Sequence, residues 1–280
     1  MKILILGASG FLGSYLSNYL QSVGHQISIA SRECWEDFSL SSRNNSKLEE
    51  LFSLNEVVIN CIAETDIGKC DHLIGIEANE VIPRKISTLI SLYSIYCVHI
   101  STDAFYNSTL NNSNENSRIT LNNYYAKQKF NAELALEGTN SIILRTSFVG
   151  KNPRNIGMID YLISSLRQEK KIFGWNDVFT SSVHITDLAR LIDMLIHHKK
   201  KGIFNFGTDQ SYSKFQLLEA IIKNFNHSLE VLPINSPLNH ATRNLNCGMS
   251  SKKLISNFNF NLPTFNDVVQ KCTLDLKSSL

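Results

Sequence analysis

Several features that the sequence lacks limit what the protein can be. Its 280 residues include six cysteines, with no Cys-x-x-Cys pair and no histidine at metal-ligand spacing. Scattered cysteines of this kind are typical of reduced thiols in the cytoplasm, so we predict neither a disulfide framework nor a metal site. No apolar run could span a bilayer, and the first one, residues 3–6, is too short for a signal peptide. We therefore expect a cytoplasmic protein with no membrane partner.

An excess of charge of either sign is also missing. The chain has 27 basic and 25 acidic residues, a formal net charge of +2. This balance gives no general attraction to nucleic acid or to a membrane surface. The densest basic run, residues 197–201, is predicted to be the last turn of a helix, where the helix dipole favours cations. With 43% hydrophobic residues, the composition is that of an ordinary globular protein.

The first thirteen residues predict a strand, a tight turn and a helix. Residues 3–6 form an unbroken apolar run, which is typical of a strand inside a parallel sheet. Gly7, Gly10 and Gly13 follow at a spacing of three, before an amphipathic stretch. Glycines at such a turn let the backbone approach a pyrophosphate, which the positive end of the helix then faces. We predict nucleotide binding here, the alternative being a purely structural turn.

Strands and helices alternate through the first half of the chain, which predicts an α/β fold with a Rossmann-like, doubly wound parallel sheet. The predicted strands are residues 26–30, 56–61, 96–100 and 141–146, and the predicted helices are 78–93 and 124–137. Residues 1–150 are thus expected to form an NAD(P)-binding domain. Residues 151–280 are expected to form a smaller α/β substrate-binding lid, whose strands can interleave with the first domain.

Helices of this second region are predicted at residues 158–169, 186–200 and 213–225, with short strands near residue 172 and at 203–206. Thr186 and Ser213 are the expected N-caps, and Gln216 is placed to complete a capping box with Ser213.

The end of the second predicted strand bears on cofactor choice. It is followed by Ser31, Arg32 and Glu33. At this point of a dinucleotide fold an acidic residue binds the ribose hydroxyls, whereas an arginine accommodates a 2′-phosphate. Because Arg32 is closer to the strand end, we predict NADP(H) rather than NAD(H). The alternative is that both side chains are only solvated.

The chemistry is predicted to come from three residues. Tyr125 and Lys129 are four apart on a predicted helix, so their side chains share one face. An ammonium beside a phenol favours the phenolate and lowers its pKa, which makes the tyrosine a better proton donor. Thr102 follows a predicted strand at the edge where such sheets bind ligands. Thr102 can hydrogen-bond a carbonyl oxygen that Tyr125 protonates, while a nicotinamide supplies hydride.

These motifs resemble the extended short-chain dehydrogenase/reductases, and within them the dTDP-4-dehydrorhamnose reductase branch. The matching stretches are residues 7–13, 60–63, 100–103, 125–129 with Glu133, 144–147, and Arg243 followed by 250–254. The resemblance implies that Thr102 and Tyr125 are catalytic and that Lys129 tunes Tyr125 and holds the nicotinamide ribose. It also implies a set of cofactor contacts: Gly10, Phe11, Leu12, Cys61, Ile62 and Ala63.

The candidate substrate contacts are Asp103, Arg145 and Arg243. Arg145 could bind a substrate diphosphate, but it could equally form an ion pair that only stabilises the fold. Asp103 could instead only bond local backbone, as Asp often does at the end of a strand. Trp175 is expected to pack in the lid rather than to stack on a sugar.

Departures from the family pattern limit the choice of substrate. The related dehydratases carry Thr-Asp-Glu, but here Ala104 follows Asp103, so dehydration is disfavoured. The sequence also differs from that of the rhamnose reductases at residues 104–108, at Ala132 and over residues 151–182. A related but different keto sugar is therefore an alternative substrate.

Together these observations predict an NAD(P)H-dependent reductase of a nucleotide-linked 4-keto-6-deoxy sugar, in deoxysugar or surface polysaccharide biosynthesis. The alternatives are a non-catalytic NADP-binding regulator, as in a regulatory subunit of methionine adenosyltransferase, and a nucleotide-sugar epimerase. Family members often dimerise, so a homodimer is expected without an interface signature in the sequence.

Overall fold

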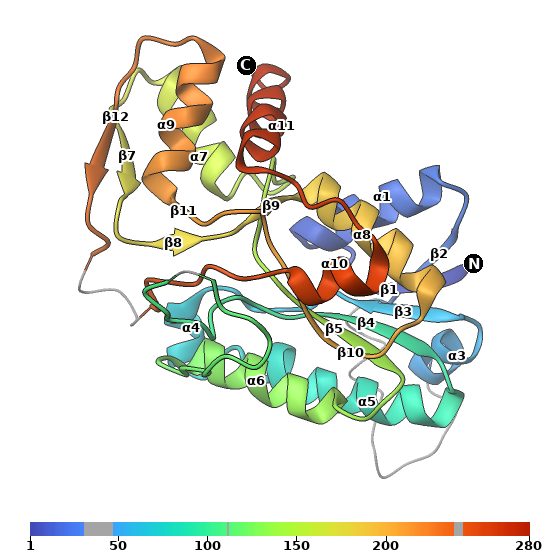
Figure 1. The fold of residues 1–280 in the computed structure, drawn as a ribbon. Helices are drawn as coiled ribbons and strands as arrows, with labels where there is room; N and C mark the ends of the chain where they lie inside the picture. Colours follow the sequence, from blue (N-terminus) through green and yellow to red (C-terminus); the bar gives the residue numbers. More distant parts are fainter. Residues whose placement is uncertain (31–46, 111, 238–242) are drawn as a thin grey trace. The chain divides into compact units, whose positions relative to one another are not determined.

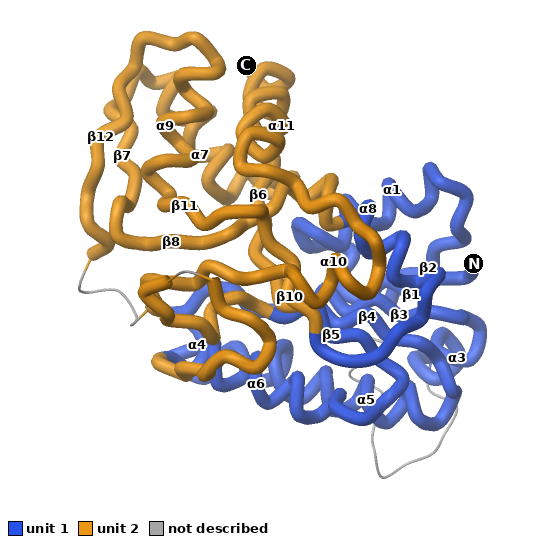
Figure 2. Tube along the Cα trace, viewed as in Figure 1, with its two compact units in different colours: residues 1–101, 123–144, 189–203 blue, residues 102–122, 145–188, 204–280 orange. Residues whose placement is uncertain are grey.

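The computed structural model describes residues 1–30, 47–110, 112–237 and 243–280 of the protein. Two compact units make up this chain (Figure 2). Unit 1 comprises residues 1–101, 123–144 and 189–203, and unit 2 comprises residues 102–122, 145–188 and 204–280. The predicted contact Arg32 lies outside the described residues.

A six-stranded sheet has the order β10-β5-β4-β3-β1-β2. Its strands are β1 (Lys2–Leu6), β2 (Gln26–Ala30), β3 (Val57–Asn60), β4 (Tyr96–Ile100), β5 (Ser141–Thr146) and β10 (Gly202–Phe206). β1 pairs in parallel with β2 and β3, and β4 pairs in parallel with β3 and β5. Every residue of β3, β4 and β5 is buried, as expected for strands covered on both faces. The Rossmann-like parallel sheet predicted from the sequence is confirmed.

Helices cover both faces of this sheet in unit 1. They are α1 (Phe11–Ser22), α3 (Lys47–Ser53), α4 (Ile67–Asp71), a π-helical turn (Glu77–Val81), α5 (Ile82–Tyr93), α6 (Tyr124–Leu136) and residues 189–198 of α8 (Ile185–His198). Figure 1 shows α5 and α6 on one face and α1 on the other. Apolar side chains of α5, among them Ile86 and Leu89, pack with Leu4, Leu6 and Val58 of the sheet. This core fixes the strand ends, at which the predicted site residues lie.

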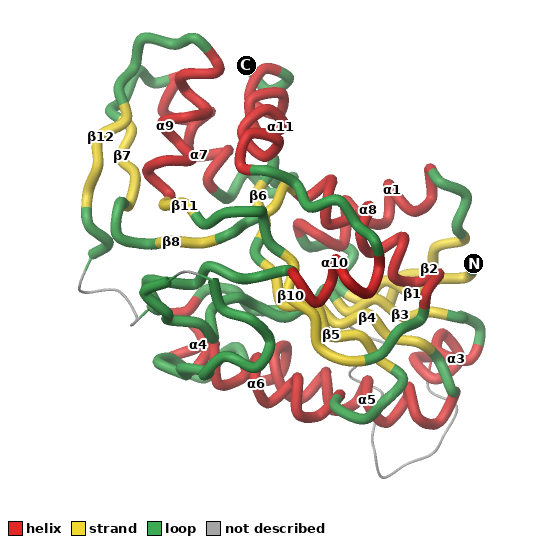
Figure 3. The backbone as a smooth tube through the Cα atoms, in the orientation of Figure 1, coloured by secondary structure: helices red, strands yellow, loops and turns green. Residues whose placement is uncertain are grey.

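Unit 2 has its own apolar core. Its helices are α7 (Met158–Arg167), α9 (Lys214–Phe225), α10 (Lys252–Phe258) and α11 (Phe265–Lys277). Its short strands are β6 (Phe148–Val149), β7 (Ile172–Trp175), β8 (Phe179–Thr180), β9 (Val183–His184), β11 (Tyr212–Ser213) and β12 (Val231–Ile234). Leu162 of α7, Ile221 of α9 and Cys272 of α11 meet in one buried cluster. Figure 3 shows these three helices beside the short strands.

The predicted helices end within two residues of the observed ones, but three details differ. Residues 77–81 form a π-helical turn before α5, α8 ends at His198 so that residues 199–201 of the basic run lie beyond it, and one predicted N-cap is wrong. Ser213 caps α9, and it forms the predicted capping box with Gln216. Thr186 does not cap α8, because this helix begins at Ile185. The hydroxyl of Thr186 instead lies 2.9 Å from Nδ1 of His184, and the same ring nitrogen accepts the backbone N–H of Thr186 at 3.3 Å.

The five cysteines in the described part of the chain are all free thiols. Within the same part, no helix is both long enough and apolar enough to cross a bilayer.

Candidate active site

The turn between β1 and α1 is built so that backbone packs on backbone. Gly7 has φ +80°, and a Cβ added there would lie 3.0 Å from the carbonyl carbon of Cys61 and 3.0 Å from the nitrogen of Ile62. A Cβ at Gly13 would lie 2.2 Å from the carbonyl oxygen of Gly7. Both positions therefore require glycine, since a side chain would force the turn away from α1 and from the end of β3.

Gly10 completes this turn and begins α1. Its N–H donates to the carbonyl oxygen of Gly7 at 2.9 Å. As N-cap of α1 it is extended, and it provides no side-chain cap to the first turn of the helix, which begins with Phe11 and Leu12. An uncapped helix N-terminus behind a glycine turn fits the pyrophosphate of a dinucleotide, because its N–H groups and dipole favour an anion.

A buried amide positions the loop after β3. Asn60 is fully buried, and its Oδ1 accepts the N–H of Ile62 at 3.1 Å. Its Nδ2 lies 3.0 Å from Nδ1 of His99 on β4. These bonds hold the predicted cofactor contacts Cys61, Ile62 and Ala63 beside Gly7, so the structure brings both cofactor segments together in unit 1.

Lys129 is held inside unit 1 by α6 and β4. Its side chain is buried, and Nζ donates to the carbonyl oxygen of Ile100 at 2.7 Å. Burial lowers the pKa of Lys129 to about 8, against the opposing effects of Glu133 and Cys61. Tyr125 lies one turn earlier on α6 and is half-buried, so the predicted pair shares one helix face.

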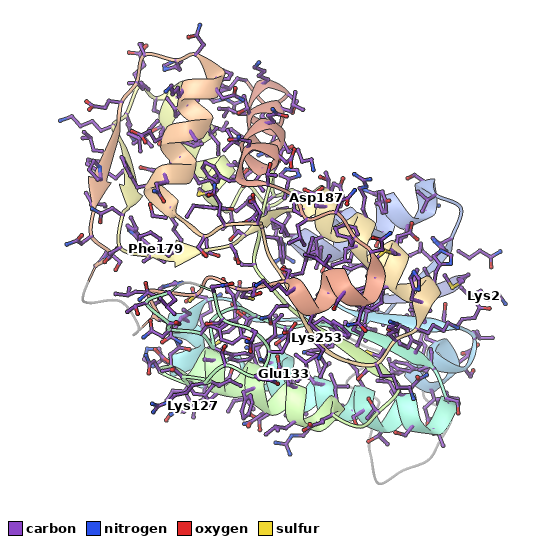
Figure 4. All side chains as sticks on the ribbon, in the orientation of Figure 1. Lys2, Lys127, Glu133, Phe179, Asp187 and Lys253 are labelled. Carbon is purple, nitrogen blue, oxygen red and sulfur yellow. The ribbon has the colours of Figure 1, made fainter. Side chains whose placement is uncertain are left out.

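Thr102 directly follows a residue that is tied to α6. Ser101 Oγ donates to the buried carboxylate of Glu133 at 2.5 Å. Figure 4 labels Glu133 on α6 together with the exposed Lys127. Thr102 itself is buried, and its Oγ1 accepts the N–H of Ala104 at 3.1 Å. The hydroxyl is thereby fixed in the turn that leaves the carboxyl end of β4.

Unit 2 contains a cluster of two cations and an indole. Lys214 Nζ lies 4.2 Å from the centre of the Trp175 ring, and the Arg243 guanidinium lies 5.9 Å from the same centre. Burial and then the charge of Arg243 lower the pKa of Lys214 to about 8. Two positive charges held this close favour an anion between them, and the indole offers a flat surface to a sugar or base.

Asp103 belongs to the same cluster. Its Oδ2 accepts the hydroxyl of Thr180 at 2.9 Å. Burial raises its pKa to about 6, although the Thr180 bond and the charge of Lys214 favour the carboxylate. Of the predicted substrate contacts, Asp103 and Arg243 thus share one site with Lys214.

Arg145 lies in a different environment. Only 2% of the residue is exposed, and Nη1 donates to the hydroxyl of Tyr106 at 2.7 Å. Its guanidinium also lies 5.1 Å from the centre of the Phe105 ring. These contacts account for Arg145 as a packed residue, and its binding of substrate stays a prediction.

Sequence reasoning missed Lys214 and Thr180, and it included Asn60 only as part of the matching stretch 60–63, without a role of its own. Lys214 looks like any polar first residue of a helix, and the proximity of Trp175 comes only from the tertiary fold. The position of Asn60 did indicate a structural role, because a buried amide side chain at the end of an apolar strand must find hydrogen-bond partners.

Comparisons with known proteins give a matching family model and solved structures of similar fold. A family model described as RmlD substrate binding domain matches residues 1–278. Comparison with curated proteins gives no match. A dTDP-4-dehydrorhamnose reductase from Bacillus anthracis str. Ames, solved with NADP, is 20% identical and superposes with a TM-score of 0.85, over 98% of each chain.

Two further solved structures are similar. A hypothetical dTDP-4-dehydrorhamnose reductase from Sulfolobus tokodaii is 26% identical, with a TM-score of 0.78 over 95% of this chain and 99% of its own. MoeE5, solved with UDP-glucuronic acid and NAD, is 17% identical, with a TM-score of 0.80 over 100% of both chains. At these identities, the Bacillus and MoeE5 structures show a shared fold.

Proposed function

Because the chain belongs to the RmlD substrate binding domain family, we propose that it is an NAD(P)H-dependent reductase of a nucleotide-linked 4-keto-6-deoxy sugar. The observation that carries this proposal is the position of Lys129, buried beside the cofactor loop and one helical turn from Tyr125. A protein that only bound a nucleotide would have no chemical need for Thr102, Tyr125 and Lys129 together, since proton donation to a carbonyl oxygen is a catalytic requirement.

The glycine turn and the loop at residues 61–63 fit a dinucleotide, with Phe11 and Leu12 at the start of the helix that faces it. Lys129 is placed to hold the nicotinamide ribose. When bound, the nicotinamide supplies the hydride. NADP(H) is preferred over NAD(H) in this proposal, supported by the sequence argument for Arg32 and by the NADP-bound Bacillus structure.

Residues of the chain itself bind and protonate the keto oxygen of the substrate and bind its diphosphate. Thr102 donates a hydrogen bond to the keto oxygen, and Tyr125 gives it a proton as negative charge develops. Lys129 stabilises the tyrosinate that is left. Lys214 and Arg243 bind the diphosphate. Trp175, which was expected from the sequence to pack in the lid, packs on the sugar or the base in this proposal, because its ring lies beside both cations. The substrate class is supported by the nucleotide-sugar ligand named for MoeE5.

The test measures oxidation of NADPH and NADH with a panel of dTDP-, UDP- and GDP-linked 4-keto-6-deoxyhexoses. We expect the wild type to reduce one of them and Tyr125→Phe to lower kcat by about 100-fold or more. Tyr124→Phe is the matched control, because Tyr124 is the preceding residue of the same helix and is exposed. No turnover with any sugar, together with cofactor binding that survives Tyr125→Phe, would instead favour a regulator or an epimerase.

A further inference from the structure

Two histidines and an aspartate from distant parts of the chain meet in unit 1. His25 immediately precedes β2, and Asp193 and His197 lie in the last two turns of α8. Asp193 Oδ1 lies 2.9 Å from His25 Nε2 and 3.6 Å from His197 Nε2. One ligand atom from each residue lies within 4.8 Å of the others, which among the described residues occurs in no other group of His, Cys, Asp or Glu. We propose that this cluster binds one divalent transition-metal ion of the zinc class.

The donor set and its spacing suit such an ion. Imidazole nitrogen and carboxylate oxygen are ordinary zinc ligands at about 2.0–2.2 Å, which places two ligands of a tetrahedral ion roughly 3.4 Å apart. The two separations from Asp193 Oδ1 lie on either side of that value. Asp193 and His197 are four residues apart on one face of α8, the spacing that helical zinc ligands use.

The surroundings favour a cation as well. The cluster lies at the C-terminal end of α8, where the helix dipole is negative. Asp193 contributes one negative charge, and histidines bind metal in their neutral form.

Burial indicates how the ion would enter and what it would do. The His25 side chain is 7% exposed and is therefore held in place, whereas that of His197 is 60% exposed. The ion enters from solvent, and water completes its coordination. His25 lies at the amino end of β2, whereas the cofactor segments follow the carboxyl ends of β1 and β3. The metal therefore stabilises the fold by joining α8 to the α1–β2 connection, and takes no part in the reduction.

The test is calorimetric titration of the chelator-treated full chain with zinc chloride, with cobalt(II) absorption and thermal unfolding as further readouts. We expect one ion per chain and a rise in Tm of about 5 °C when the ion is present at roughly 100 times its Kd. His197→Ala and Asp193→Asn should each weaken zinc binding by at least about 10-fold. Loss of a residue that only hydrogen-bonds a metal ligand already lowers metal affinity by about that much, and loss of a ligand should lower it at least as far.

His198→Ala is the matched control, because His198 is the exposed neighbour of His197 on the same helix and lies outside the cluster. Its affinity for zinc should equal that of the wild type. His197 is itself exposed, so the metal-free Tm of His197→Ala should be unchanged, which separates loss of the ligand from loss of the fold. Wild type that binds no zinc, or His197→Ala and Asp193→Asn that bind it as tightly as the wild type, would overturn the proposal.

Discussion

Two lysines have lowered pKa values for different reasons. Burial lowers the pKa of Lys129 to about 8, and its ammonium group donates to a backbone carbonyl. The pKa of Lys214 is also about 8, but there the positive charge of Arg243 adds to the effect of burial. An anion bound between Lys214 and Arg243 would offset the repulsion between these two charges, whereas the effect of burial on Lys129 would remain. At the scale of residues, we therefore expect the charge state of Lys214 to respond to the binding of an anionic substrate.

Substrate affinity should fall as Lys214 loses its proton. Because its pKa is lowered to about 8, the ammonium form dominates near pH 7 and is lost above pH 8. We expect the KM for the nucleotide sugar to rise by about 10-fold between roughly pH 7 and pH 9, from the loss of one charge-assisted contact. Steady-state kinetics of Lys214→Arg gives the control, since arginine stays charged and should flatten this rise. An equal rise in the variant would assign the effect to another group.

Asp103 should cost stability at neutral pH. The pKa of Asp103 in the folded protein is about 6, above the ordinary value for Asp. The protonated carboxyl therefore contributes its full stability below about pH 4, and this contribution is lost as the pH rises through 6 and the group ionises. Asp103→Asn cannot ionise and still accepts the Thr180 hydroxyl. We expect the variant to be more stable near pH 7.5, by up to about 3 kcal/mol for two pKa units, and the difference to vanish near pH 4. Urea unfolding at both pH values measures it. A less stable variant at the higher pH would mean that Lys214 fully compensates the charge.

At the scale of elements, the start of α9 links a helix cap to the proposed substrate site. Ser213 and Gln216 form the capping box, and Lys214 is the first residue of the helix that they fix. Ser213→Ala should cost about 1 kcal/mol of unfolding free energy and, because Lys214 then loses its fixed position over Trp175, should also raise the KM for the nucleotide sugar several-fold.

Thr264→Ala provides the matched control for this prediction. Thr264 and Asp267 form the corresponding capping box of α11. Its loss should cost a similar free energy in chemical denaturation and leave the KM unchanged. Equal KM values in the two variants would show that the cap of α9 serves only the stability of the helix.

Local patterns predicted the elements better than they predicted the substrate site. The glycine turn and the pair of Tyr125 and Lys129 lie within short stretches, so spacing alone was enough to find them. Lys214 comes to Trp175 through tertiary packing, which no local pattern encodes. The failed N-cap at Thr186 has a local origin, since the helix already begins at Ile185 and the Thr186 hydroxyl lies against the ring of His184.

At the scale of the whole molecule, cofactor binding should be visible as stability. A ligand that binds only the folded state raises Tm, by about 5 °C for this length at roughly 100 times its Kd. We expect NADPH to give a larger rise than NADH at equal concentration in thermal unfolding. Gly13→Val should remove the rise in Tm with either nucleotide, since the valine side chain would clash with the carbonyl oxygen of Gly7 and displace the turn. Equal shifts by the two nucleotides would contradict the preference for NADP(H).

The order of strands in the sheet also has a consequence for synthesis of the chain on the ribosome. β5 is complete at Thr146, but β10, its outer neighbour, begins only at Gly202. Until then β5, whose six residues are all buried in the finished fold, is an open sheet edge. Such edges pair readily with other chains, so we expect the nascent protein to be prone to aggregation until β10 is made. A polypeptide ended near residue 150 would remain at that stage and aggregate.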